Sequence, residues 1–145
     1  MTVVVDASVA LKWYIDEDDS EAALALLESG ERLIAPDLLV AELCNGAWRL
    51  IRRGGLRREQ MAIIASGVAA AFATLYGSAH LAPRAAAVAL ELDHPVYDCF
   101  YIALAEIDGS SMVTADHRLL ERLAGSHWAA RVFALDAVTS GGGSG

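Results

Sequence analysis

Two short apolar runs, each followed by an aspartate and a helical pattern, limit what this chain can fold into. The β-branched run Val3–Val5 is too short for a helix, and it passes through Asp6 into an apolar-periodic segment over residues 7–15. A second run, Met112–Val113, is soon followed by Asp116 and a short helical segment. Strands that alternate with helices favour a parallel sheet covered by helices. The sequence therefore predicts an α/β fold with a mostly parallel central sheet of four to five short strands and helices on both faces.

The remaining segments continue this alternation. The run Met112–Val113 belongs to a strand expected at residues 111–114, and further strands are expected at 33–35 and 132–135. Helices are expected at 17–27, 37–53, 56–76, 83–92, 97–107 and 116–123. Asp37 is a suitable N-cap for the helix that follows it, and Gly54 and Gly55 stop that helix. The Gly-Gly turn predicts that segments 37–53 and 56–76 pack as a helical hairpin.

The length of the chain suits a single domain, which we place at residues 1–138. Residues 139–145 are rich in Gly and Ser and have the composition of a flexible tail. Cys44 and Cys99 lack the spacing of a zinc site, so we interpret both as small buried apolar residues in a reducing cytoplasm. Residues 60–83 carry no charged side chain, but Ala, Gly, Ser and Thr dominate them, which favours a buried or dimer-facing helix over a membrane span.

Four carboxylates occupy the positions that most need an explanation. Asp6 and Asp116 follow strands, and parallel sheets bind their ligands beyond the carboxyl ends of the strands. Glu42 and Asp98 lie in apolar helical patterns, with no Lys or Arg within four residues to pair with either. If the four side chains converge, two charges 4 Å apart repel by about 4 kcal/mol at an effective dielectric of 20. A shared Mg²⁺ or Mn²⁺ ion, which prefers oxygen ligands, is the more economical account of all four.

Each acid also has a simpler explanation when it is taken alone. Asp6 and Asp116 are each placed to cap the helix that follows, and a cap requires no metal. Glu42 and Asp98 can each form a salt bridge with a basic residue that is distant in the sequence. These alternatives stay open at the level of the sequence.

Four sequence elements together resemble the PIN-domain nucleases, and within them the VapC toxins of bacterial toxin–antitoxin pairs. They are D-A-S at residues 6–8, A-E-L at 41–43, Y-D-C-F-Y-I-A-L-A at 97–105 and V-T-A-D-H-R-L at 113–119. They occur in the order of the family, and the resemblance extends to about Leu135. The chain departs from the family at Cys99, where Ala is frequent. The resemblance implies a PIN-like fold with a protruding helical hairpin.

The resemblance also implies which residues form the site. The acidic ligands of the family map onto Asp6, Glu42, Asp98 and Asp116, which are the catalytic and metal-binding candidates, and its companion hydroxyls map onto Ser8 and Thr114. We expect Asp6 and Asp98 to be direct ligands and Asp116 to act directly or through water, whereas Glu42 is either a ligand or the general base. Ser8 and Thr114 either hold the carboxylates, contact the scissile phosphate or only cap local backbone.

The activity that the resemblance implies is hydrolysis of RNA phosphodiester bonds by a water activated by one or two Mg²⁺ or Mn²⁺ ions. It further implies a cytoplasmic homodimer, without a membrane segment, that is inhibited by a cognate antitoxin protein in a heterotetramer or a larger complex.

Basic residues are few, and the net charge of −8 is unusual for a protein that binds nucleic acid. One basic cluster lies at the turn of the predicted hairpin, where guanidinium groups either guide RNA or cover apolar surface. The candidate RNA-binding residues are Lys12, Arg49, Arg52, Arg53 and Arg118. His94 has no second His as a partner and His117 is expected to be exposed, so a metal-free histidine mechanism has little support.

Two other functions compete with this interpretation. The chain is alternatively a catalytically weak dimeric binding module that docks a partner protein. It is otherwise a structured-DNA nuclease of the same superfamily, although such nucleases are usually longer.

Overall fold

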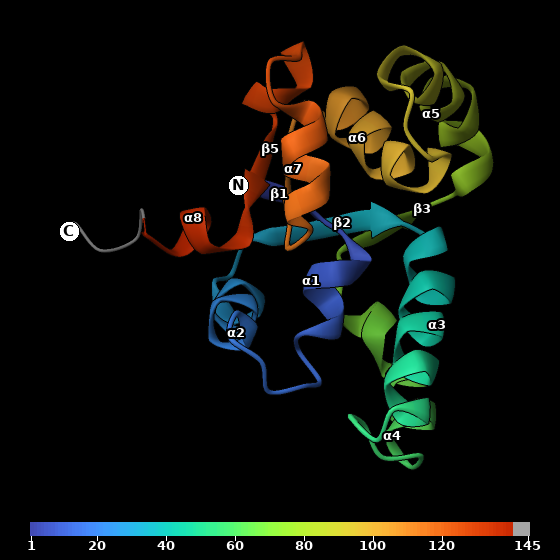
Figure 1. The fold of residues 1–145 in the computed structure, drawn as a ribbon, viewed down its shortest axis with the longest axis vertical. Helices are drawn as coiled ribbons and strands as arrows, with labels where there is room; N and C mark the ends of the chain where they lie inside the picture. The colour runs from blue at the N-terminus through green and yellow to red at the C-terminus, as the bar shows by residue number, and fades with distance from the viewer. Residues whose placement is uncertain (141–145) are drawn as a thin grey trace.

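The five strands form one parallel sheet at the centre of the molecule (Figure 1), in a computed structural model that describes residues 1–140. In chain order the strands are β1 Thr2–Val5, β2 Arg32–Pro36, β3 Thr74–Tyr76, β4 Ser111–Thr114 and β5 Val132–Ala134. Their order across the sheet is β3-β2-β1-β4-β5, and every neighbouring pair is parallel. The predicted α/β class is confirmed.

The central strand β1 lies between β2 and β4, so that Val4 is opposite both Ile34 and Met112. All three side chains are completely buried. Strands covered on both faces are continuously apolar rather than alternating, which is the pattern of the run Val3–Val5. Asp6 follows at the carboxyl end of this buried strand, and this position removes its carboxylate from bulk water.

Helices surround the sheet. They are α1 Ala7–Leu11, α2 Ser20–Glu28, α3 Leu38–Arg52, α4 Gln60–Gly67, α5 Ser78–Leu92, α6 Val96–Asp108, α7 His117–Leu123 and α8 Leu135–Ser140, with 3₁₀ turns η1 Val68–Ala71 and η2 His127–Ala130. In Figure 1, α5 and α6 pack together above the sheet, and α1 and α2 lie below it. Helix α6 contacts β1, β2 and β4, so it packs against the middle of the sheet.

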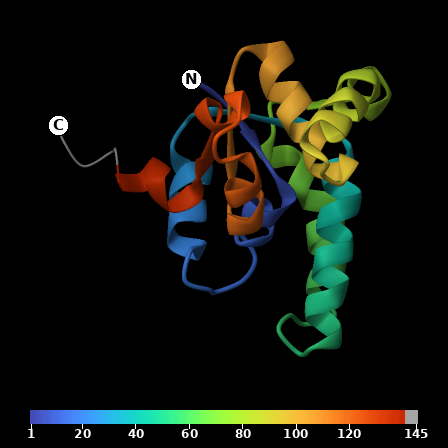
Figure 2. The ribbon, with the colours of Figure 1, turned by 45° about the horizontal axis from the view of Figure 1, so that its top comes forward.

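The helical hairpin of α3 and α4 extends away from the sheet, as Figures 1 and 2 show. Helix α3 ends where Gly54 adopts a φ of 79°, a conformation that glycine allows without steric cost. The prediction of one long helix over residues 56–76 was wrong. The segment instead forms α4, η1 and the edge strand β3, because Thr74–Tyr76 pairs with β2.

Other element boundaries also differ from the prediction. Helix α5 begins at Ser78 rather than at Pro83, and the Asp37 carboxylate accepts hydrogen bonds from the Ser78 backbone N–H and hydroxyl. Helix α1 ends at Leu11, earlier than expected, and α8 runs past residue 138, where the predicted domain ended. Residues 141–145 of the predicted tail lie outside the described residues. Within residues 1–140, no helix is long and apolar enough to cross a bilayer.

Candidate active site

Asp6 is held rigidly at the end of β1. Ser8 Oγ donates to Asp6 Oδ1 at 2.5 Å, Thr114 Oγ1 donates to Asp6 Oδ2 at 2.5 Å, and the Val9 backbone N–H donates to Oδ1 at 3.2 Å. Only 4% of the residue is exposed. Burial raises the pKa of the Asp6 carboxyl to about 6, although these hydrogen bonds lower it, and the negative charge of Asp98 raises it further. Asp6 therefore caps α1, as one alternative predicted, and is also a buried acid beside another acid.

Asp116 is joined to Asp6 through the end of β4. The Asp116 backbone N–H donates to Thr114 Oγ1 at 3.0 Å, and the same hydroxyl donates to Asp6. Ser8 Oγ accepts from the Ala115 backbone N–H at 3.1 Å, which ties the two strand ends together a second time. The Asp116 carboxylate itself caps α7, accepting from the backbone N–H groups of Arg118 at 2.9 Å and of Leu119 at 3.3 Å.

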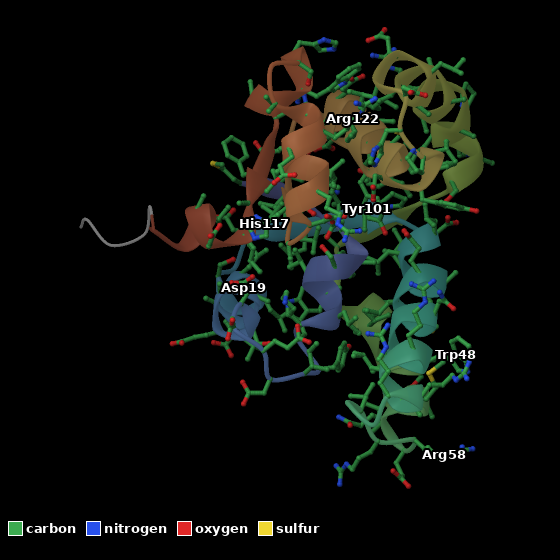
Figure 3. The ribbon with its side chains drawn as sticks, in the orientation of Figure 1. Asp19, Trp48, Arg58, Tyr101, His117 and Arg122 are labelled. Carbon is green, nitrogen blue, oxygen red and sulfur yellow. The ribbon has the colours of Figure 1, made fainter. Side chains whose placement is uncertain are left out.

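Glu42 projects from the second turn of α3 toward α6. Its Oε1 accepts a hydrogen bond from the Tyr101 hydroxyl at 2.7 Å. Burial raises the pKa of Glu42, the Tyr101 hydrogen bond lowers it, and the charge of Asp98 raises it. Tyr101 is 1% exposed, and burial raises the pKa of its phenol, as do the charges of Glu42 and Asp6. Figure 3 shows Tyr101 where the ribbons of α6, α1 and α3 approach one another.

Tyr101 was not among the predicted site residues. A buried tyrosine usually finds a partner for its hydroxyl, and Tyr101 lies three residues after Asp98 on the same face of α6. That spacing is the signal that sequence reasoning could have used.

Asp98 lies in the first turn of α6, and its Oδ2 is 2.7 Å from His94 Nε2. The prediction considered only Lys and Arg as local partners of Asp98, and His94, four residues earlier, is the partner that it did not consider. Asp98 also raises the pKa values of Asp6 and Glu42, so the three acids share one electrostatic environment.

We call Asp6, Glu42, Asp98 and Asp116 the acidic site. Within residues 1–140 none of the four pairs with a Lys or Arg side chain. The donor set of carboxylate and hydroxyl oxygens suits a hard divalent cation, which would also relieve the repulsion among the acids. As they stand, however, no three His, Cys, Asp or Glu side chains of the described part of the chain are placed to hold a single ion. Glu42, Asp98 and Asp116 instead bind Tyr101, His94 and the α7 backbone.

Comparison with known proteins identifies the family. The model of the PIN domain family matches residues 3–126. This chain belongs to the PIN domain family. It is 34% identical over 124 residues to Ribonuclease VapC3 of Pyrobaculum aerophilum, an alignment that covers 84% of this chain and 95% of that protein.

Two solved structures share the fold of this PIN domain. A crystal structure of a Pyrobaculum aerophilum protein superposes with a TM-score of 0.70 at 22% identity, covering 97% of this chain and 88% of that one. A toxin–antitoxin complex from Klebsiella pneumoniae contains a chain with a TM-score of 0.62 at 16% identity, covering 92% of this chain and 97% of that one. The predicted PIN-like fold is thereby confirmed.

A groove of about 580 Å³ adjoins the acidic site of this PIN domain. Ser8, Glu42 and Asn45 line it, together with Arg49 and Tyr97. Arg49 also lines a second cavity of about 350 Å³, whose other residues are Trp48, Arg52 and Arg53. The structure therefore places the predicted basic residues of α3 in a row that starts at the acids.

The two other predicted RNA-binding residues are placed differently. The Lys12 ammonium lies 3.0 Å from the Glu17 carboxylate and is thereby engaged. Arg118 is exposed on the first turn of α7, beside the exposed His117 that Figure 3 labels. Cys99 is completely buried, as expected, whereas Cys44 is only partly buried.

Proposed function

We propose that this PIN domain is a divalent-metal-dependent endoribonuclease and the toxin of a toxin–antitoxin pair. The single observation that supports this most is the cluster of Asp6, Glu42 and Asp98, which are close enough to raise pKa values within the cluster and have no Lys or Arg partner in the described residues. The name of the similar Ribonuclease VapC3 supports RNA as the substrate.

The four acids would hold Mg²⁺ or Mn²⁺, and the hydroxyls would keep them in place. When bound, such an ion lowers the pKa of water and offsets the negative charge that develops on the phosphate. Ser8, Thr114 and Val9 fix the orientation of Asp6, which supports its role as a ligand. Tyr101 orients Glu42, which acts either as a ligand or as the base that takes a proton from water.

The partners follow from the same proposal. We propose a homodimer in the cytoplasm that is inhibited by a cognate antitoxin protein in a heterotetramer or larger assembly. The Klebsiella pneumoniae chain of the same fold was solved in a toxin–antitoxin complex, which supports a protein partner of this kind. Large apolar side chains are exposed at Leu90, Tyr97 and Ile107, and such side chains are often covered by a partner.

A second candidate function, a catalytically weak binding module, is favoured by one observation. Glu42, Asp98 and Asp116 already have hydrogen-bond partners within the protein, so their present positions are satisfied without an ion. Such a module would bind its protein partner equally well in the presence of EDTA and would not cleave RNA.

The test measures cleavage of RNA by the purified chain with Mg²⁺ or Mn²⁺. We expect EDTA to abolish cleavage and Asp98→Asn to remove it while the circular dichroism spectrum is retained. Asp108→Asn is the matched control, because Asp108 is an exposed acid at the opposite end of the same helix. Cleavage by the Asp98→Asn protein at the wild-type rate would refute the proposal.

A further inference from the structure

The hairpin concentrates positive charge that no acidic side chain of residues 1–140 neutralises by an ion pair. Arginines occupy positions 49, 52, 53, 57 and 58, which is five of the 11 basic residues of a chain with 19 acidic ones. All five side chains belong to exposed residues. Within residues 1–140 none of them forms an ion pair, whereas Lys12 and Arg84 pair with Glu17 and Glu106. Exposed guanidinium groups without an ion pair are available to bind an anionic ligand, and the fork of the guanidinium matches a phosphate.

An exposed tryptophan lies among these arginines. Trp48 is 47% exposed, and the guanidinium carbon of Arg52, one turn further along α3, lies 5.1 Å from the centre of its ring. The other two tryptophans are placed inside the protein: Trp13 donates to the Ala23 carbonyl, and Trp128 is buried. Figure 3 shows Trp48 on α3 well away from the sheet, with Arg58 at the tip of the hairpin. Stabilising the core therefore does not explain Trp48.

The position of Trp48 relative to the acids follows from helix geometry. Glu42, Arg49 and Arg53 are separated by seven and four residues, so they lie on one face of α3. Trp48 lies about 120° around the helix from Glu42. Trp48 and Arg52 both line the 350 Å³ cavity, which shares Arg49 with the groove beside the acidic site. Trp48 lies six residues after Glu42, about 9 Å along the helix axis. That is a distance of a few nucleotides.

We propose that Trp48 and Arg52 form a stacking platform for an unpaired base of single-stranded RNA whose backbone follows the arginines of α3 toward the acidic site. Tryptophan and guanidinium planes both stack on bases, and a base in a duplex does not offer its face. The continuous row from Glu42 through Arg49 to Arg53 favours a polymer with regularly spaced phosphates over an acidic peptide. The inference rests on the proposed function, because it places a segment of the substrate a few nucleotides from the cleaved bond.

The test measures the affinity of a fluorescently labelled single-stranded oligoribonucleotide for the protein. All proteins carry Asp98→Asn and are studied in EDTA, so that no RNA is cleaved. We expect Trp48→Ala to weaken binding about tenfold, the usual value of one base stacked on an aromatic ring. Trp48→Phe should retain most of the affinity. Phe133→Ala is the matched control, since Phe133 is an exposed aromatic residue on β5.

Two further measurements separate stacking from charge and from a structural effect. The first uses a series of oligonucleotides that each lack one base. When the base that stacks on Trp48 is the missing one, the Trp48→Ala protein and the protein that retains Trp48 should bind the oligonucleotide with equal affinity, and this should occur at a single position. Trp48→Ala should leave the slope of log Kd against log salt unchanged, whereas Arg53→Ala should reduce it by about 0.7, as for one phosphate contact to a single strand.

The inference is overturned if the Trp48→Ala protein binds the single strand as tightly as the protein that retains Trp48. The same conclusion follows if Trp48→Ala lowers the affinity for every abasic oligonucleotide by the same factor. It is also overturned if Trp48→Ala changes the sedimentation of the free protein, since the surface would then be an interface between copies of the chain. Failure of the proposed function is a different result: the wild-type protein with Mg²⁺ or Mn²⁺ would cleave no RNA. If the wild type cleaves RNA and Trp48→Ala binds it normally, only the stacking platform is wrong.

Discussion

One helix, α3, carries two regions of opposite character. At its start Glu42 belongs to the acidic site, where negative charges are partly or fully buried and hydrogen-bonded to Tyr101, Ser8 and Thr114. At its end Trp48 and the arginines are exposed and unpaired within the described residues. The first region has the carboxylate and hydroxyl oxygens that suit a cation, and the second has guanidinium groups that suit an anion. Under the proposed function, chemistry and substrate affinity would therefore be separated along one rigid element.

The largest expected effect comes from neutralising one charge in each region. Asp98→Asn should lower kcat by about a thousandfold, because a catalytic metal contributes several kcal/mol to the transition state. Arg53→Ala should raise KM several-fold and leave kcat nearly unchanged, since a phosphate contact remote from the reacting bond stabilises substrate and transition state equally. Steady-state cleavage kinetics with one RNA substrate measure kcat and KM for both variants. If the two variants lose kcat alike, the proposed separation is wrong.

The next effect is on stability as a function of pH. The pKa of Asp6 is about 6 in the folded protein and 3.8 in a model peptide, so the folded state binds a proton more tightly than the unfolded chain. Its contribution is therefore fully present below pH 3.8 and is lost as the pH rises through about 6, a change of roughly 3 kcal/mol. Urea unfolding at pH 4 and pH 7 should show this loss in the wild type and not in Asp6→Asn.

Urea unfolding in the presence of Mn²⁺ tests whether a cation neutralises the charge of Asp6. If the destabilising charge is the one that a cation neutralises, Mn²⁺ at pH 7 should restore stability to the wild type, because an ion that binds only the folded state stabilises it. The Asp6→Asn protein should gain less stability from Mn²⁺. A wild-type stability that is independent of pH between 4 and 7 would contradict the electrostatic description of Asp6.

A smaller effect is expected when Glu42 loses its partner. Tyr101→Phe removes only the hydroxyl that donates to Glu42, so Mn²⁺ affinity should fall about tenfold, the lower end of the range for residues that orient metal ligands. Tyr14→Phe is the control, because Tyr14 lies after the end of α1 and does not line the groove beside the acidic site. Calorimetric titration measures the affinity, and a thermal melt reports any loss of fold. Equal Mn²⁺ affinity in the two variants would remove Tyr101 from the site.

Four of the five strands in residues 1–140 were predictable because their signals are local, and the acids attract attention for the same reason. Val3–Val5 is apolar in every position because β1 is covered on both faces, and Asp6 directly follows it. The acids Glu42 and Asp98 stand out because carboxylates are rare in apolar helix patterns. A sequence can therefore show that such groups need a partner without showing which partner they have.

The features that were missed depend on tertiary contacts. Strand β3 is three residues long and gains its stability by pairing with β2, which an Ala-rich helical pattern on its N-terminal side conceals. The Tyr101 hydrogen bond requires α6 to pack beside α3, and the cap of α5 comes from Asp37, 41 residues away. The His94 contact with Asp98 was visible as a spacing of four residues, and considering only Lys and Arg concealed it.

Titration of the purified protein with Mn²⁺ tests most directly whether the acids act as one cation site. We predict a stoichiometric site in the wild type that Asp6→Ala and Asp98→Asn each abolish and that Asp108→Asn leaves intact. Undiminished Mn²⁺ binding in both site variants, or heat signals equally small in all four proteins, would contradict the account.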